Sequence, residues 1–321
     1  MRIIRPEQRL YFIGNPGLTV HEALASAVGK LYGGTNPHGR LFEWNGVDAW
    51  TQVAPTLDLE SYIHSLAVFN GKLYGGTAWG GRLFEWNGVD AWVQVAPQLA
   101  GQTHIVSLAV FNGKLYGGTR LNGLLFEWNG INAWVQVAPQ LAGQTTVLSL
   151  AVFNGKLYGG TAESGRLFEW NGVDAWTQVA PQLLRQTHIY SLAVFNGKLY
   201  GGTRPNGLLF EWNGVDAWTQ VAPQLLGQTY IFSLAVFNGK LYGGTAESGL
   251  LFEWNGVDAW TQVAPQLLGQ TYILSLAVFN GKLYGGTYPH GRLFEWNGSN
   301  AWVQVAPQLD GEEQIRSLAV L

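Results

Sequence analysis

Hydrophobic and polar positions alternate along the chain in short runs, and Asn-Gly or Gly-Gly pairs recur at short intervals. In the unit that begins at Ser65 the runs are SLAVF (65–69), KLYGGT (72–77), RLFEW (82–86) and AWVQVA (91–96). Alternation over four to eight residues predicts half-buried β-strands, and the glycines interrupt every window long enough for a helix. Each unit is therefore predicted to hold four strands, named A to D in chain order, with a type I′ hairpin turn at Asn70-Gly71.

The same unit returns every 42 residues, so that seven copies span 294 residues and leave only short ends. Four antiparallel strands in a repeat of this size are typical of one propeller blade. A solenoid is the alternative, but antiparallel strands within each repeat favour a ring. The prediction is an all-β, seven-bladed β-propeller formed by residues 23–321 as one domain, preceded by an irregular cap at residues 1–22.

Several residues of each unit resemble the kelch repeat. The stretch AVFNGKLYGG ends in Gly75-Gly76, an aromatic follows at Phe84 or Trp86, and Trp92 lies in the last strand. The resemblance covers nearly all of residues 23–316, although the unit is slightly shorter than a kelch repeat. WD-repeat or tectonin-like propellers are the alternatives, and each implies the same fold. Kelch and WD-repeat propellers commonly bind proteins, which is what the resemblance implies for this chain.

Closure of the ring depends on the two ends of the repeat array. Residues 317–321 (SLAVL) copy strand A, whereas residues 23–28 (ALASAV), 294 positions earlier, are a degraded copy without the Asn-Gly turn. Both compete for the inner strand of the first blade. An open ring would expose two bare sheet edges, so residues 317–321 are predicted to complete the first blade. In the alternative, these residues begin a truncated eighth blade.

Composition narrows the classes of partner. The net charge is −3, and all seven lysines lie in the GKLYGGT copies, so no basic stripe indicates nucleic acid binding. No apolar run is long enough to span a membrane, no signal peptide is apparent and no cysteine is present. A monomer in the cytoplasm is the resulting prediction.

The invariant residues of the repeat have a structural interpretation. The glutamates of LFEW are predicted to pair across strands with the lysines of GKLYGG. The fourteen repeated tryptophans are predicted to pack between blades, because a core between sheets needs large side chains.

The copies differ mainly in the three-residue B–C loops and in two positions just before strand A. An antiparallel meander places both regions at the same end of every blade, so we expect them on one face around the mouth of the central channel. Alternation along the chain sends the two variable side chains before strand A to one side and the isoleucine between them to the other. The candidate ligand-binding residues are His38, Trp79, Arg120, Arg204, Tyr288 and His290 from the loops, and Tyr62, His64, His104, His188, Tyr190, Tyr230, Phe232, Tyr272 and Arg316 from the segments before strand A.

These features predict a non-catalytic binding module that recognises a protein or peptide through its variable face. The alternatives are a lectin that binds glycans between blades, and an amplified or designed repeat scaffold with no evolved ligand. Six scattered histidines and no Asp-rich loop give no pattern of metal ligands. Closure of the ring could bring His38, His290 and His64 together only by chance, and the sequence predicts no metal, cofactor or enzymatic activity.

Overall fold

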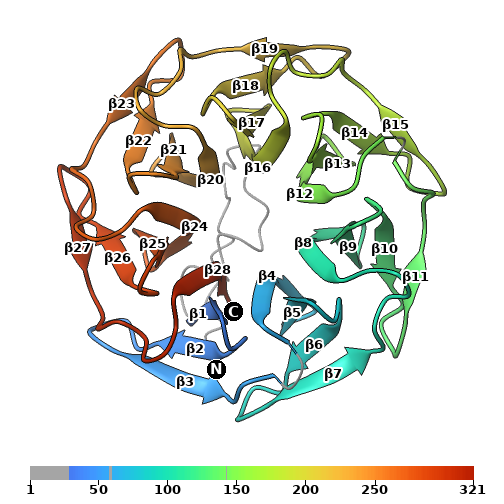
Figure 1. Ribbon diagram of the computed structural model, residues 1–321, viewed down its shortest axis with the longest axis horizontal. Coiled ribbons are helices and arrows are strands. Elements are labelled where there is room, and N and C mark those ends of the chain that lie inside the picture. Colours follow the sequence, from blue (N-terminus) through green and yellow to red (C-terminus); the bar gives the residue numbers. More distant parts are fainter. Residues whose placement is uncertain (1–28, 58–59, 142) are drawn as a thin grey trace, which may run out of the picture.

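A computed structural model describes residues 29–57, 60–141 and 143–321 of the chain. Its 28 strands form seven four-stranded antiparallel blades around a central axis, as Figure 1 shows. Blade 1 has the strand order β28-β1-β2-β3, and blades 2 to 7 follow in chain order. Blades 2 and 3 are also joined by one residue pair, Ala78 with His104. The predicted seven-bladed propeller is confirmed.

Each blade runs from strand A beside the axis to strand D at the rim. The A strands of blades 1 to 7 are β28 (Gln314–Val320), β4 (Tyr62–Phe69), β8 (His104–Phe111), β12 (Val147–Phe153), β16 (His188–Phe195), β20 (Ile231–Phe237) and β24 (Tyr272–Phe279). The B strands are β1 (Leu31–Asn36), β5 (Lys72–Ala78), β9 (Lys114–Arg120), β13 (Lys156–Thr161), β17 (Lys198–Arg204), β21 (Lys240–Thr245) and β25 (Lys282–Tyr288). The C strands are β2 (Leu41–Trp44), β6 (Leu83–Trp86), β10 (Leu125–Trp128), β14 (Leu167–Trp170), β18 (Leu209–Trp212), β22 (Leu251–Trp254) and β26 (Leu293–Trp296). The D strands are β3 (Trp50–Ala54), β7 (Trp92–Ala96), β11 (Trp134–Gln136), β15 (Trp176–Gln178), β19 (Trp218–Gln220), β23 (Trp260–Gln262) and β27 (Trp302–Gln304).

The C-terminal strand closes the ring as predicted. β28 pairs with β1 in antiparallel register, from Leu31 opposite Val320 to Asn36 opposite Gln314, and the two lie side by side in Figure 1. The competing segment 23–28 and the proposed cap 1–22 lie outside the described residues.

The Asn-Gly turns between strands A and B have the predicted geometry. Asn70 and Gly71 have φ angles of 50° and 72°, and the other five Asn-Gly copies of this turn agree within a few degrees. Positive φ at both central residues is the mark of a type I′ turn, which follows the right-handed twist of the hairpin.

The glycine pair of GKLYGGT lies where neighbouring blades approach most closely. A Cβ atom on Gly160 would lie 2.7 Å from Ile189 Cγ2 of the next blade and 2.6 Å from Ser149 Oγ. A Cβ on Gly159 would lie 3.1 Å from Cη2 of Trp176, in strand D of the same blade. The same contacts recur in the other blades, so packing accounts for the invariance of the pair.

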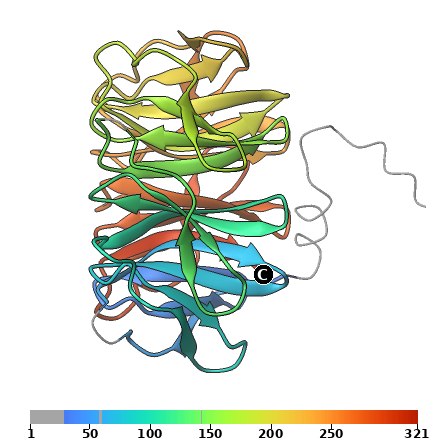
Figure 2. The ribbon, with the colours of Figure 1, turned by 90° about the vertical axis from the view of Figure 1, so that its right-hand side faces the viewer.

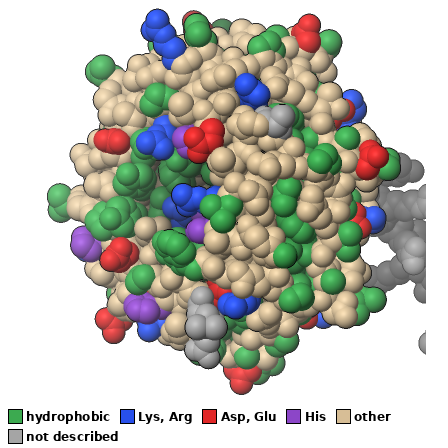
Figure 3. Space-filling view, turned by 45° about the vertical axis from the view of Figure 1, so that its right-hand side comes forward, with side chains coloured by type: hydrophobic (Ala, Val, Ile, Leu, Met, Phe, Trp, Pro, Cys, Tyr) green, Lys and Arg blue, Asp and Glu red, His purple; other side chains and the backbone are tan. Residues whose placement is uncertain are grey.

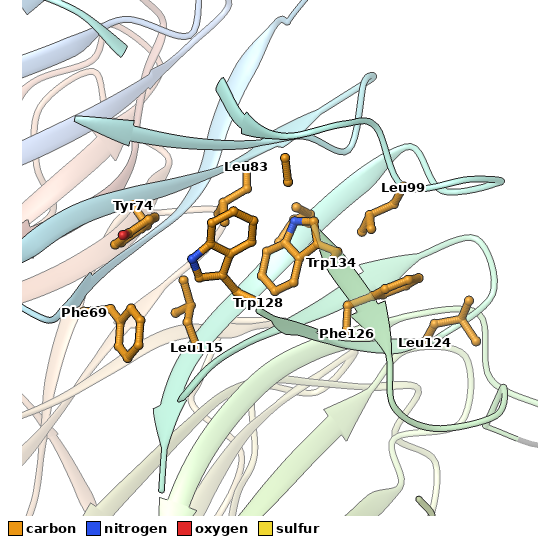
Figure 4. Packing of buried hydrophobic residues seen from close by; sticks show 11 residues of the cluster. Phe69, Tyr74, Leu83, Leu99, Leu115, Leu124, Phe126, Trp128 and Trp134 are labelled. Atoms are coloured by element: carbon orange, nitrogen blue, oxygen red, sulfur yellow. The ribbon is translucent and has the colours of Figure 1, made fainter. Parts of the chain in front are cut away.

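The repeated tryptophans fill the space between blades, which confirms their predicted role. In one such core, Trp128 and Trp134 of blade 3 pack with Phe69, Tyr74 and Leu83 of blade 2, as Figure 4 shows. Their rings meet edge to face with centroids 6.1 Å apart, a favourable arrangement for aromatic pairs. All seven blades have the equivalent tryptophan pair.

The predicted lysine–glutamate pairs are present in all seven blades. The Nζ–Oε1 distances lie between 2.7 and 2.9 Å, as for Lys72 and Glu85. The other carboxylate oxygen of Glu85 accepts a hydrogen bond from the Tyr74 hydroxyl. Because the lysines are more than half exposed, each ion pair contributes at most about 1 kcal/mol.

Seven serines link the inner strands into a closed ring. The hydroxyl of each donates to the backbone carbonyl of an isoleucine or valine in the next blade, as Ser65 does to Ile105. Ser317 of β28 continues the series to the carbonyl of Ile63, so the ring of hydrogen bonds crosses the closure without interruption.

A buried carboxylate strengthens the blade that the two ends of the chain share. Glu312, only 1% exposed, precedes β28, and its Oε1 lies 3.3 Å from Arg40 Nη1 and 3.1 Å from His38 Nδ1. Glu60 pairs with Arg82 in the same way in blade 2. The equivalent position holds glutamine in the other five blades, and in three of these the arginine is replaced by leucine: Gln102 with Leu124, Gln186 with Leu208 and Gln228 with Leu250.

This comparison between blades yields a double-mutant prediction. Glu312→Gln creates the Gln–Arg combination of blades 4 and 7, where Nε of Arg166 and of Arg292 is buried without a hydrogen-bond partner. It is expected to destabilise the protein by about 1–3 kcal/mol, because Arg40 loses its buried carboxylate partner. The double variant Glu312→Gln/Arg40→Leu recreates the Gln–Leu combination of blade 3, and it is expected to recover most of the loss. Urea unfolding of the wild type and both variants measures this. A double variant less stable than the single one contradicts the interpretation.

Candidate functional site

The inner strands begin earlier than predicted and contain a β-bulge. β4 starts at Tyr62 rather than Ser65, so the variable positions before strand A belong to the strand itself. Its register shifts between Ile63, opposite Thr77, and Ser65, opposite Gly76, so that His64 has no partner in strand B. The same shift occurs in all seven blades. Bulges bend a strand and redirect a side chain, and here the redirected residue is a variable one.

The bulges separate the buried positions from the variable ones. Ile63 and its counterparts in the other blades are fully buried, as the alternation predicts. The bulged residues form a ring at the mouth of the central channel: His64, Val106, Leu148, Tyr190, Phe232, Leu274 and Arg316. The serines and leucines that follow them line the channel below.

The B–C loops and the starts of the A strands lie next to each other in the blades where the A–B strand pairing extends to both regions. His104 lies opposite Arg120, His188 opposite Arg204 and Tyr272 opposite Tyr288 in the A–B ladders. The C-terminus, at the other end of its A strand, lies on the right-hand face in Figure 2. The starts of the A strands and the B–C loops therefore lie on the opposite face, which we call the variable face.

A cavity of about 560 Å³ opens on the variable face at the channel mouth, and residues from all seven blades line it. This volume is in the range of ligand pockets. Figure 3 shows basic (Lys or Arg) and His side chains among hydrophobic ones on this side of the molecule. Seven of the predicted site residues line the cavity: His64, Arg120, His188, Tyr190, Arg204, Phe232 and Arg316.

The charged residues of the cavity lining are mostly cationic. Arg120, Arg204 and Arg316 line it, whereas Glu163 is the single acidic residue in the lining. No carboxylate of the described residues forms an ion pair with any of these three arginines. Arg316 instead donates from Nη2 to His64 Nε2 at 3.2 Å.

The histidines beside the arginines are held neutral. Burial, followed by the charge of Arg316, lowers the pKa of His64 well below its usual value. Burial and the charges of Arg120 and Arg316 lower the pKa of His104 to about 4. Because His64 Nε2 accepts from Arg316, the proton of the neutral ring is on Nδ1, which has no partner among the described residues.

Aromatic side chains form one wall of the cavity. His188 and Tyr190 stack with ring centroids 5.2 Å apart, and Tyr190 stacks on Phe232 of the next blade at 4.7 Å. Arg316 crosses toward this wall, with its guanidinium carbon 5.3 Å from the centre of the Phe232 ring. Burial raises the pKa of Tyr190, so its hydroxyl stays protonated at neutral pH. The wall offers flat apolar surface next to positive charge.

The other eight predicted residues lie outside the cavity lining. His104 packs behind it against His64. The ring centroid of the exposed Trp79 lies 5.5 Å from that of His104. Tyr62 lies near His64, Tyr230 lies against the guanidinium of Arg204, and Tyr272 meets Tyr288 edge to face. His38 contacts Glu312, and His290 is exposed. The idea that His38, His290 and His64 meet is wrong: His38 binds Glu312, whereas His64 contacts Arg316. No group of three potential metal ligands occurs in the described part of the chain.

The prediction from sequence omitted eight of the residues that line the cavity, among them Leu121 and Glu163 from the B–C loops of blades 3 and 4. Both are the second residue of a variable triplet and have positive φ, 96° and 74° respectively. They were missed because residues were chosen by type, aromatic or basic, whereas loop position was the better signal.

No protein-family model and no curated protein matches this sequence. Solved structures do match. The WD40 β-propeller domain of Doa1 has a TM-score of 0.62 at 16% identity, covering 81% of this chain and 86% of that one. This chain has the β-propeller fold. At such identity the match shows the fold and nothing more.

Two other propellers extend the comparison. The extracellular domain of a putative one-component system, BT4673 from B. thetaiotaomicron, has a TM-score of 0.63 at 17% identity. The match covers 84% of this propeller but only 38% of that chain. YCF48, solved with a D1 peptide bound, has a TM-score of 0.55 at 14% identity, covering 72% of this chain and 78% of that one.

The described residues of the propeller include no helix with the length and apolar character needed to traverse a bilayer. The cytoplasmic location stays a prediction.

Proposed function

We propose that the propeller is a non-catalytic recognition module that binds a protein or peptide at the channel-mouth cavity of its variable face. The observation that carries the proposal is the contrast within each blade. The residues that hold the ring are nearly constant, whereas seven structurally equivalent bulged positions carry six different residue types and converge on one cavity. Rigid scaffolds with varied loops are a common basis of binding specificity.

Two further observations support a peptide as the ligand. YCF48, a propeller of similar fold, was solved with a peptide bound. The cavity is also lined by Tyr, Phe, His and Arg side chains, and aromatic residues and arginine are enriched at the energetic centres of protein interfaces.

Peptide display on the purified propeller tests the proposal. We expect the wild type to enrich a set of related peptides, and Tyr190→Ala/Phe232→Ala to weaken their binding at least about tenfold, because these rings form the aromatic wall. Val173→Ala/Val215→Ala is the matched control, since both valines are about 75% exposed in the turns between strands C and D, away from the cavity. Kd values from fluorescence titration give the comparison.

Three results would count against the proposal. Peptides that bind the cavity double variant as well as the wild type would place recognition elsewhere. If no peptide is enriched but a glycan array gives several strong hits, the lectin alternative replaces it. If neither assay gives a ligand, the scaffold alternative does.

A further inference from the structure

Positive charge exceeds negative charge among the side chains that line the channel-mouth cavity. The three arginines come from blades 1, 3 and 5 and exceed the lining carboxylates by two charges, in a protein whose overall net charge is −3. Glu163, the one acidic lining residue, accepts a hydrogen bond from the Thr145 hydroxyl at 3.2 Å and forms no ion pair with the arginines. The cavity therefore carries an excess of positive charge, although the protein as a whole is negatively charged.

Arg316 occupies the innermost position of the three. Arg316 and His64 line both the cavity and the channel below it, so they form the cavity floor. The neighbours of the guanidinium are neutral: His64 Nε2 at 3.2 Å and the ring of Phe232. Burial lowers the pKa of Arg316; Tyr190 and Tyr62 partly oppose this effect, and the charge of Arg120 adds to it. A partly buried cation without a counter-ion carries a desolvation cost that an incoming anion would offset.

Guanidinium groups favour one class of ligand in such a place. Their planar donor arrays match carboxylate and phosphoryl oxygens, and these charge-assisted hydrogen bonds are stronger than neutral ones. Arg316 uses Nη2 to hold His64, which leaves its other donors for a ligand. The aromatic wall of His188, Tyr190 and Phe232 offers apolar surface for the rest of the ligand side chain.

We propose that the channel-mouth cavity is an anion-binding pocket that takes a carboxylate or phosphoryl group of the bound peptide, with Arg316 at its floor and Arg120 and Arg204 at its sides. The inference rests on the proposed function and specifies its ligand as an acidic or phosphorylated peptide. The specificity then comes from one anchoring anion at the centre, with the outer variable residues contacting the flanking positions.

Peptide selection provides the first test. A random 12-residue display library is expected to yield, on the wild type, peptides that share one Asp or Glu position. The best peptide is then synthesised in three forms, with glutamate, glutamine or phosphoserine at that position. Replacement of glutamate by glutamine is expected to weaken binding about 10- to 100-fold, the effect of losing a hydrogen bond to a charged group. The phosphoserine form distinguishes the two anion sources, since the better-matched group binds more tightly.

Arginine variants provide the second test. Arg204→Gln and Arg316→Gln are expected to weaken the glutamate peptide by a similar factor and to leave the glutamine peptide nearly unchanged. Arg185→Gln is the matched control, because Arg185 is exposed and outside the cavity lining but carries the same charge. Melting temperatures of all variants confirm that they fold.

The outcomes separate this inference from the proposed function. Neutral selected peptides, or arginine variants that bind the glutamate peptide as the wild type does, would overturn the anion pocket. An equal loss in Arg185→Gln would also overturn it, because the effect would then be overall charge. In each case a continued loss of binding in Tyr190→Ala/Phe232→Ala would leave peptide recognition at the cavity intact.

Discussion

Deleting residues 314–321, which include β28, is expected to abolish the cooperative unfolding of the propeller. The deletion removes every pairing partner on the inner side of β1 and the last member of the serine ring. It also removes Ile315, which is fully buried against Gly286 of blade 7, and loss of one such side chain alone costs about 2–5 kcal/mol. The exposed edge of β1 is then free to pair with another molecule.

Thermal unfolding and size-exclusion chromatography measure the effect of the deletion. We expect a broad transition at lower temperature and a shift toward oligomers. A synthetic peptide of residues 314–321 added in excess is expected to restore part of the melting temperature, whereas a scrambled peptide is not. An unchanged melting temperature and a monomeric elution would show that another segment, such as residues 23–28, fills the position.

Gly160→Ala is the second change with a large expected effect. Its new Cβ would lie 2.9 Å from Cβ of Ile189, an atom fixed by the backbone of the next blade, so the blades must separate. We expect a loss of about 1–3 kcal/mol from overpacking. Where an alanine fits, a glycine-to-alanine substitution stabilises a protein by about 0.4–1 kcal/mol. A measured loss of stability therefore indicates overpacking, whereas a gain argues against it.

Gly159→Ala is the matched comparison for this change. Its nearest contact is the far edge of the Trp176 ring at 3.1 Å, which can shift more easily than Ile189. Urea unfolding is expected to rank the proteins as wild type, Gly159→Ala and Gly160→Ala in order of falling stability. A Gly160→Ala protein as stable as the wild type would mean that the invariance of the glycine pair has another cause.

The fold could be predicted because the information is local and repeated seven times. Asn70-Gly71 specifies a hairpin turn by its own backbone geometry, and one prediction of four strands applies to every copy. The closure could be predicted because residues 317–321 match the invariant strand A, whereas residues 23–28 do not. Each of these signals is carried by a short stretch of sequence and can be recognised without knowing which distant residues it contacts.

The candidate site depended on contacts that sequence spacing does not reveal. The bulge at His64 depends on how Ile63 and Ser65 fit against the neighbouring blades. The alternating sequence pattern predicts a regular strand at this place and does not indicate a bulge. The approach of Arg316 to His64 joins residues 252 positions apart across the closure. The pair of Glu312 with Arg40 has the same origin, although comparing the seven copies at that position would have revealed the two exceptional glutamates.

The bulge common to all seven blades has a consequence for how specificity is encoded. Each bulge presents one side chain to the same cavity from an interchangeable framework. Moving the variable segments one blade around the ring would keep the composition, volume and net charge of the mouth constant and rotate the pattern as a whole. Exchanging two of them would instead create a different pattern from the same parts. Under the proposed function, the choice of ligand would therefore depend on the circular order of the segments as well as on their content.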